Sequence, residues 1–274
     1  MTAPHNPIPE PSAPPEPQVQ LTNVTGPTAP SAENPPWTIA EVLAMVPLTF
    51  VAIVCCVLAA AYILDPYMAP RGPWFRNIAR PEVMVAGQLL AYVLIFILMY
   101  KLVRNHSNGH VLEAIRWNWP ENWRSYLLAG AGLEVCLLPL AYLLPMPKNL
   151  PVDEFFKTTR DAYILLVFGV FFAPLFEELF FRGFLYPALT RRLGMGLSIV
   201  LTALGFAFIH APQLRGSWGP ILIVFLVGLA LTAVRAIKKS VAATVLMHMA
   251  YNASIFVVTY IATDGFRHME KFNQ

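Results

Sequence analysis

Two adjacent carboxylates lie in a stretch of this sequence that is otherwise apolar. Glu177 and Glu178 occur within 162–190, where Arg182 is the one other charged residue. An ionisable group at bilayer depth costs at least a few kcal/mol, so such groups usually mark a functional site. Glu178 and Arg182 are four residues apart with the acid first, which is the favourable order for an ion pair on one helix face. We expect Glu177 to point about 100° away from that pair and to be available for chemistry.

Polar residues also occur in two later apolar stretches. His210 ends one of them, and the next contains His248 and Asn252, which are four residues apart and share a helix face. A carboxylate with a histidine can deprotonate water as a general base. A second histidine with an asparagine amide can stabilise an oxyanion. Since no Ser or Cys has an obvious activating partner, the residue types favour hydrolysis of a peptide bond by water inside the bilayer.

The same residues are compatible with a metal site. Glu177, His210 and His248 would give zinc one carboxylate and two imidazoles, with a position left open for water. However, the sequence has no HExxH motif, and asparagine is a weak zinc ligand. We therefore favour a mechanism without a cofactor and keep Zn²⁺ as the alternative.

The composition indicates that these residues are carried by a membrane protein. Of the 274 residues, 57% are hydrophobic and only 13% are charged, with a net charge of +3. So few charges cannot cover so much apolar surface in water, which excludes an ordinary soluble domain. The low charge also excludes disorder of the whole chain. The lipid bilayer is thus an expected partner, and nucleic acid is not.

Seven stretches are long enough, or nearly so, to cross a bilayer as helices. They are 42–64, 83–100, 125–147, 162–190, 193–214, 216–234 and 240–263. We predict an all-α, polytopic bundle of about seven to eight transmembrane helices over 37–266, a multi-pass protein of the plasma membrane. The Lys and Arg residues of alternate loops sum to equal numbers on the two sides, so they favour neither orientation.

The ends of the chain have a different composition. Residues 1–36 hold 11 of the 25 prolines and neither Lys nor Arg, so we predict a disordered Pro-rich tail. Residues 267–274 are predicted to be a short polar tail.

Three short motifs resemble those of the CAAX-processing and bacteriocin-processing intramembrane proteases, the type II CAAX endopeptidase-like family. The family pattern is EExxxR, then FxxxH, then HxxxN on successive membrane helices. Here the first motif is Glu177-Glu178-Leu-Phe-Phe-Arg182. The second runs from Phe206 to His210 and the third from His248 to Asn252. The resemblance covers about 155–262, and three motifs in the same order make it specific.

The resemblance implies an endopeptidase, glutamate-dependent and often described as a metalloendopeptidase, that cleaves membrane-associated proteins or peptides near the membrane surface. Its substrates include lipidated ones. By the same resemblance, Glu177 activates water and His210 helps to hold it. His248 and Asn252 stabilise the oxyanion. Glu178, Arg182 and Phe206 support these residues.

Two other functions fit the same polar residues. In a proton-coupled transporter, Glu177, His210 and His248 would pass protons, although Asn252 conducts protons poorly and seven spans do not divide into two equal inverted repeats. In a scaffold or regulator of the same fold, the polar cluster would only hold the helices together.

Overall fold

A computed structural model describes Met1 and residues 35–67, 73–107, 109–147 and 156–268. The predicted tail, 1–36, lies outside these residues apart from Met1, Pro35 and Pro36, and most of 267–274 lies outside them as well. The helices described below all fall within Ala32–Gln274, which forms one compact unit.

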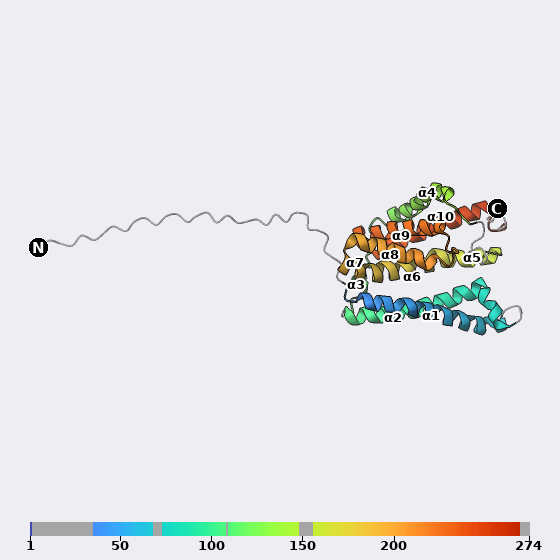
Figure 1. Cartoon of the computed structure of the whole chain (residues 1–274), viewed down its shortest axis with the longest axis horizontal. Helices are drawn as coiled ribbons and strands as arrows, with labels where there is room; N and C mark the ends of the chain where they lie inside the picture. The colour runs from blue at the N-terminus through green and yellow to red at the C-terminus, as the bar shows by residue number, and fades with distance from the viewer. Residues whose placement is uncertain (2–34, 68–72, 108, 148–155, 269–274) are drawn as a thin grey trace. The chain divides into compact units, whose positions relative to one another are not determined.

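Every regular element of the described residues is helical, which confirms the predicted all-α fold (Figure 1). Six helices in this part of the chain are long and apolar enough to cross a membrane. They are Ile39–Tyr67 (α1, Ile39–Leu64, with η1, Asp65–Tyr67), α2 (Pro81–His106), α4 (Trp123–Leu143), the long helix Thr159–Leu193, α9 (Trp218–Lys238) and α10 (Val241–Ala262). Two short elements, η2 (Trp74–Ala79) and α3 (Val111–Ala114), lie between the longer ones.

The fifth predicted span, 193–214, forms a shorter helix than its apolar stretch allows. Helix α8 runs from Met195 to His210, or 16 residues, within the predicted 193–214. It follows Gly194, whose φ of 74° is in the left-handed region, where glycine has no steric penalty. After His210 the backbone continues in turns that contain Pro212. The turns at both ends therefore shorten α8 and place His210 at its last position.

The long helix Thr159–Leu193 contains two π-helical segments. In chain order it consists of α5 (Thr159–Val167), the π-helical segment η4 (Phe168–Phe172), α6 (Ala173–Glu178), the π-helical segment η5 (Leu179–Leu185) and α7 (Tyr186–Leu193). In each π segment a backbone N–H bonds to the carbonyl five residues earlier, Ala173 to Phe168 and Tyr186 to Phe181. Such wider turns are frequent at functional sites. Here they flank the six residues of α6, which end at Glu177 and Glu178.

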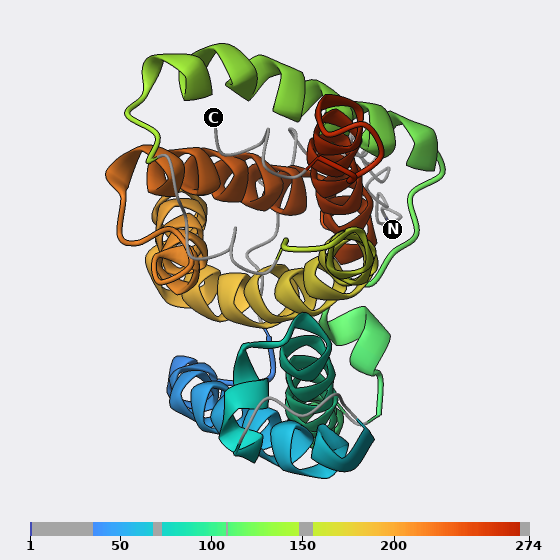
Figure 2. The same ribbon diagram turned by 90° about the vertical axis from the view of Figure 1, so that its right-hand side faces the viewer.

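Three pairs of helices pack closely against each other. Helix α1 packs on α2, α8 on α9, and α4 on α10, and Figure 2 shows α4 on the outer side of α9 and α10. The last pair approaches closely at Gly130, where an added Cβ would lie 2.1 Å from the carbonyl oxygen of Met247. Small residues allow this kind of backbone contact between membrane helices. Gly130 thus sets the position of α4 beside the turn that carries His248.

The start of α10 is fixed by the loop that precedes α4. The Ser240 hydroxyl accepts a hydrogen bond from the Ala243 N–H at 3.0 Å, which caps the helix. The same hydroxyl donates to the Asn118 carbonyl, and the Val241 N–H donates to the Arg116 carbonyl at 3.0 Å. These bonds hold the helix that carries His248 and Asn252.

Candidate active site

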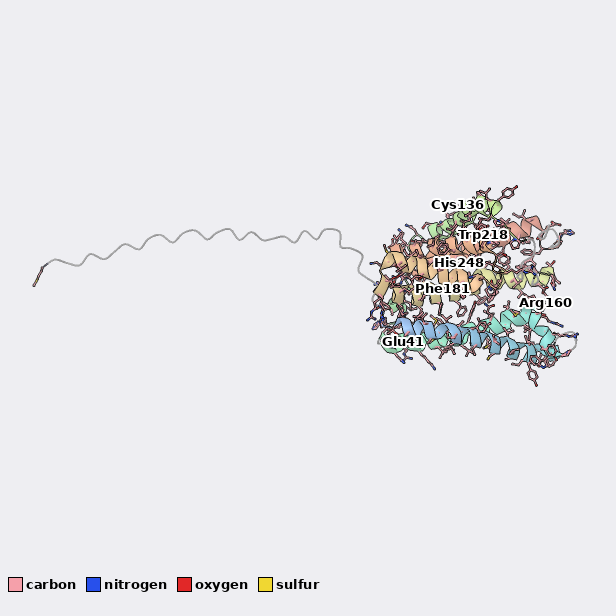
Figure 3. All side chains as sticks on the ribbon, in the orientation of Figure 1. Glu41, Cys136, Arg160, Phe181, Trp218 and His248 are labelled. Carbon is pink, nitrogen blue, oxygen red and sulfur yellow. The ribbon has the colours of Figure 1, made fainter. Side chains whose placement is uncertain are left out.

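Glu177 lies between two histidines that come from two other helices. One carboxylate oxygen, Oε1, is 3.9 Å from Nε2 of His210, at the end of α8. The other, Oε2, is 3.9 Å from Nε2 of His248, in α10. His248, labelled among the helices in Figure 3, is buried, with 3% of its surface exposed. Two helices distant in the sequence, α8 and α10, thus each place an imidazole beside the Glu177 carboxylate.

Glu178 is fully buried and accepts two charge-assisted hydrogen bonds at one oxygen. Its Oε1 accepts from Nη1 of Arg182 at 2.8 Å, which is the predicted i, i+4 pair. The same oxygen accepts from Nδ1 of His248 at 2.9 Å. Because a carboxylate only accepts, His248 carries a proton on Nδ1. Its Nε2 therefore remains on the side of Glu177.

Arg182 is held in the protein interior by several partners. It is 0% exposed. Its Nε donates to the Thr232 hydroxyl at 3.2 Å and its Nη2 donates to the Gly228 carbonyl at 3.1 Å, both on α9. The guanidinium also lies 4.5 Å from the centre of the Phe206 ring, a cation–π distance. A buried charge with this many partners is rigid, and so is the Glu178 carboxylate that it anchors.

Phe206 contacts both histidines and the buried Arg182. Its backbone carbonyl lies 2.8 Å from Nδ1 of His210. Since a carbonyl only accepts, His210 also carries a proton on Nδ1, and its Nε2 is directed to Glu177. The Phe206 ring contacts the His210 ring at 4.7 Å and the edge of the His248 ring at 5.7 Å. Phe206 therefore positions His210 through its backbone carbonyl, and its ring packs against His248.

Asn252 bonds to the backbone of the long helix. Its Nδ2 donates to the carbonyl of Gly169, in η4, at 2.7 Å. Pro174, five residues after Gly169, has no N–H to donate to that carbonyl across the wide turn. An amide nitrogen carries two hydrogens, so a second one remains for another acceptor. Asn252 is thereby fixed in position and keeps one donor.

The exposure of these side chains differs in a way that suits catalysis. The side chains of His210 and Glu177 are 20% and 13% exposed, whereas those of Glu178 and Arg182 are 0% exposed. The first pair is thus accessible to a small molecule such as water, and the second pair is sealed. A contact of 3.9 Å is too long for a direct hydrogen bond and can be bridged by one water molecule.

An apolar cavity that is open to the surface lies between α2 and the first half of the long helix. Its volume is about 500 Å³. It is lined by Val85 and Leu89 of α2 and by Arg160, Tyr163, Ile164, Val167, Phe168 and Phe172 of the long helix. One lining residue, Phe168, directly precedes Gly169, the acceptor of Asn252.

A zinc site requires several ligand side chains close enough to bind one metal ion. Within the ranges that the structure describes, no three His, Cys, Asp or Glu side chains are grouped closely enough to hold a metal ion. Zinc held by Glu177, His210 and His248 stays the alternative prediction, and we derive no chemical step from a metal.

The structure joins six of the seven residues predicted from the sequence through direct contacts, and the seventh, Asn252, bonds to Gly169 one turn after His248. It also adds three partners that the sequence analysis missed: Gly169, Gly228 and Thr232. The first two act through backbone carbonyls, which no side-chain motif reveals. The sharing of Glu178 between Arg182 and His248 was missed as well. One available signal was Pro174, whose missing N–H predicts a free carbonyl near Gly169.

The comparisons with known proteins concern this part of the chain. Residues 159–254 match the family model of the Rce1-like type II CAAX prenyl endopeptidases. The match begins at the first residue of the long helix and ends two residues after Asn252, so it includes all three motifs. Helices α1, α2 and α4 lie outside it. No curated protein and no solved structure matches the chain.

Proposed function

Residues 159–254 belong to the Rce1-like type II CAAX prenyl endopeptidase family, and from this premise we propose that the protein is an intramembrane endopeptidase. It hydrolyses a peptide bond of a membrane-associated protein near the membrane surface. The family implies peptidase activity, and the six membrane-spanning helices make this an integral, multi-pass protein. The observation that carries the proposal is the position of Glu177, 3.9 Å from an imidazole nitrogen on each side.

In the proposed reaction, water is the nucleophile and Glu177 is its base. The water lies between Glu177 and Nε2 of His210, whose proton is on Nδ1, so that this nitrogen accepts a hydrogen bond from the water. As the water oxygen attacks the substrate carbonyl, one of its protons passes to Glu177. Glu177 then gives that proton to the leaving nitrogen when the C–N bond breaks.

The negative charge that forms on the carbonyl oxygen needs donors. Asn252 supplies the amide hydrogen that Gly169 does not use. His248, whose Nδ1 bonds to the Glu178 carboxylate, supplies a second donor when its Nε2 also carries a hydrogen. Donors held in place before the reaction stabilise an oxyanion without reorganisation. In this role Arg182 acts only through Glu178.

The apolar cavity beside α2 supports a substrate with an apolar segment or a lipid chain. Its lining contains one charged residue, Arg160, and is otherwise aliphatic and aromatic. We therefore propose membrane-associated substrates, lipidated ones among them. The proposed location is the plasma membrane, and fractionation of cells tests it.

Cleavage in liposomes tests the function. The purified protein is reconstituted with membrane-anchored peptides that carry, or lack, a prenyl group on a cysteine near the C-terminus, and products are identified by mass spectrometry. We expect cleavage by the parent protein and none by Glu177→Gln. Glu134→Gln is the matched control, because it removes a membrane carboxylate of α4, outside the matched region.

The same preparation separates the alternatives. A parent protein that cleaves no peptide, together with a Glu177→Gln variant that unfolds at a much lower temperature, would favour a scaffold. Proton flux into liposomes that disappears in Glu177→Gln would favour a transporter. Either result would overturn the peptidase.

A further inference from the structure

A polar pair on α2 lies outside the matched family region and faces the long helix. Gln88 and Tyr92 are one turn apart, and Nε2 of Gln88 donates to the Tyr92 hydroxyl at 2.7 Å. Because the hydroxyl accepts this bond, its own hydrogen is directed elsewhere. Among the described residues, no hydrogen-bond acceptor for that hydrogen is found. A hydroxyl at membrane depth with an unused donor is costly unless it serves a purpose.

The Tyr92 ring is fixed between two phenylalanines of the long helix. It stacks on Phe168 with ring centres 6.2 Å apart and planes 16° apart, and it lies 4.9 Å from the Phe176 ring. Each of these phenylalanines directly precedes a residue of the site: Phe168 precedes Gly169, and Phe176 precedes Glu177. Glu177 is also close enough to act electrostatically on the Tyr92 hydroxyl. Tyr92 thus packs against the two residues that directly precede Gly169 and Glu177.

We propose that the Tyr92 hydroxyl, oriented by Gln88, donates a hydrogen bond to a backbone carbonyl of the substrate next to the scissile bond. This inference rests on the proposed peptidase function. The oxyanion is assigned to donors on α10, and Tyr92 comes from α2, so its acceptor is a neighbouring carbonyl. Tyr92 therefore binds the substrate in the ground state and the transition state alike.

Such a contact predicts a change in KM rather than in kcat. Tyr92→Phe keeps both ring contacts and loses only the hydroxyl. We expect KM to rise about tenfold, as for one lost hydrogen bond, with kcat nearly unchanged. Gln88→Leu should raise KM less, and it should add nothing when combined with Tyr92→Phe, because both act through the same donor. Tyr100→Phe is the control, since Tyr100 is on the same helix two turns further on and is 41% exposed.

Two measurements test the proposal with peptides that the parent protein cleaves. In the first, the backbone carbonyl oxygens of the peptide bonds before and after the scissile bond are replaced by sulfur, a weaker acceptor, in separate peptides. One of these two peptides should have a higher KM than the unmodified peptide for the parent protein. For Tyr92→Phe, the same peptide should have the KM of the unmodified peptide. In the second, peptide binding to inactive Glu177→Gln is compared with binding to Glu177→Gln/Tyr92→Phe, and the dissociation constant should rise about tenfold.

The results distinguish this inference from the function on which it rests. If the parent protein cleaves and Glu177→Gln does not, but Tyr92→Phe has the parent KM and affinity, the role of Tyr92 is wrong and the peptidase stands. A fall in kcat with KM unchanged also contradicts the role, because it would place the hydroxyl on the transition state. If the parent protein cleaves nothing, both proposals fail.

Discussion

Asn252 of α10 donates a hydrogen bond from its side chain to the backbone carbonyl of Gly169 in the long helix, at 2.7 Å. The carbonyl lies in a π-helical turn, and Pro174 cannot donate to it. The bond links two membrane helices at the level of the site and leaves one amide hydrogen free. It explains how one asparagine can be both fixed and available as a donor.

Replacement of Asn252 tests this double role. Asn252→Leu keeps the approximate volume and removes both hydrogens. We expect kcat to fall about 10²- to 10³-fold, as for the loss of one oxyanion donor, with little change in KM. Steady-state kinetics with a membrane-anchored peptide measure both constants. Ser254→Ala is the control on the same helix, because its hydroxyl bonds only to the Ala250 carbonyl. A raised KM with the parent kcat would contradict the assignment.

Glu178 and Glu177 are adjacent in the chain, yet we expect their replacement to lower stability by very different amounts. Glu178→Gln removes the negative charge opposite fully buried Arg182 and should cost about 3 kcal/mol of the free energy of unfolding. Glu177→Gln changes a partly exposed group without a direct hydrogen bond, so its effect should be small. Unfolding in detergent, by heat or by denaturant, measures both. Equal unfolding temperatures for the two variants would show that Arg182 does not depend on Glu178.

The contact of α4 with α10 offers a paired test of packing. In Gly130→Ala, the new methyl group would meet the Met247 carbonyl at 2.1 Å, and α4 must move away. We expect a loss of about 1–3 kcal/mol, as for other overpacked sites. Gly132→Ala, two residues further on, meets no atom within 4 Å and should leave stability unchanged or raise it slightly. If the two variants unfold alike, the close approach of α4 and α10 is wrong.

A metal-free mechanism predicts that activity does not depend on zinc. Active protein should contain far less than one zinc per chain, and EDTA should leave the rate of cleavage unchanged. Elemental analysis of the same preparation used for kinetics checks this. Zinc near one per chain that disappears together with activity, and restores it on return, would instead support Glu177, His210 and His248 as ligands.

The long helices and most of the site were predictable because their causes are local. Charge-free stretches of sufficient length must be helical in a bilayer, and the Glu178–Arg182 pair follows from their i, i+4 spacing. The other partners of Arg182 were not predictable, because they are a backbone carbonyl and a hydroxyl on α9. Pro174 indicates a free carbonyl near Gly169, but not that Asn252 of another helix bonds to it. The π segments were also missed, since an argument from 3.6 residues per turn does not reveal an extra residue in a turn. Tyr92 is not part of any of the three motifs, so the sequence did not indicate it.

Glu177→Gln tests the central claim most directly, when kcat and the unfolding temperature are measured on one preparation. The account predicts an unchanged unfolding temperature and a loss of kcat of about 10²- to 10⁴-fold, the usual contribution of a general base. If Glu177→Gln retains the kcat of the parent protein, Glu177 is not the base and the proposed mechanism is wrong.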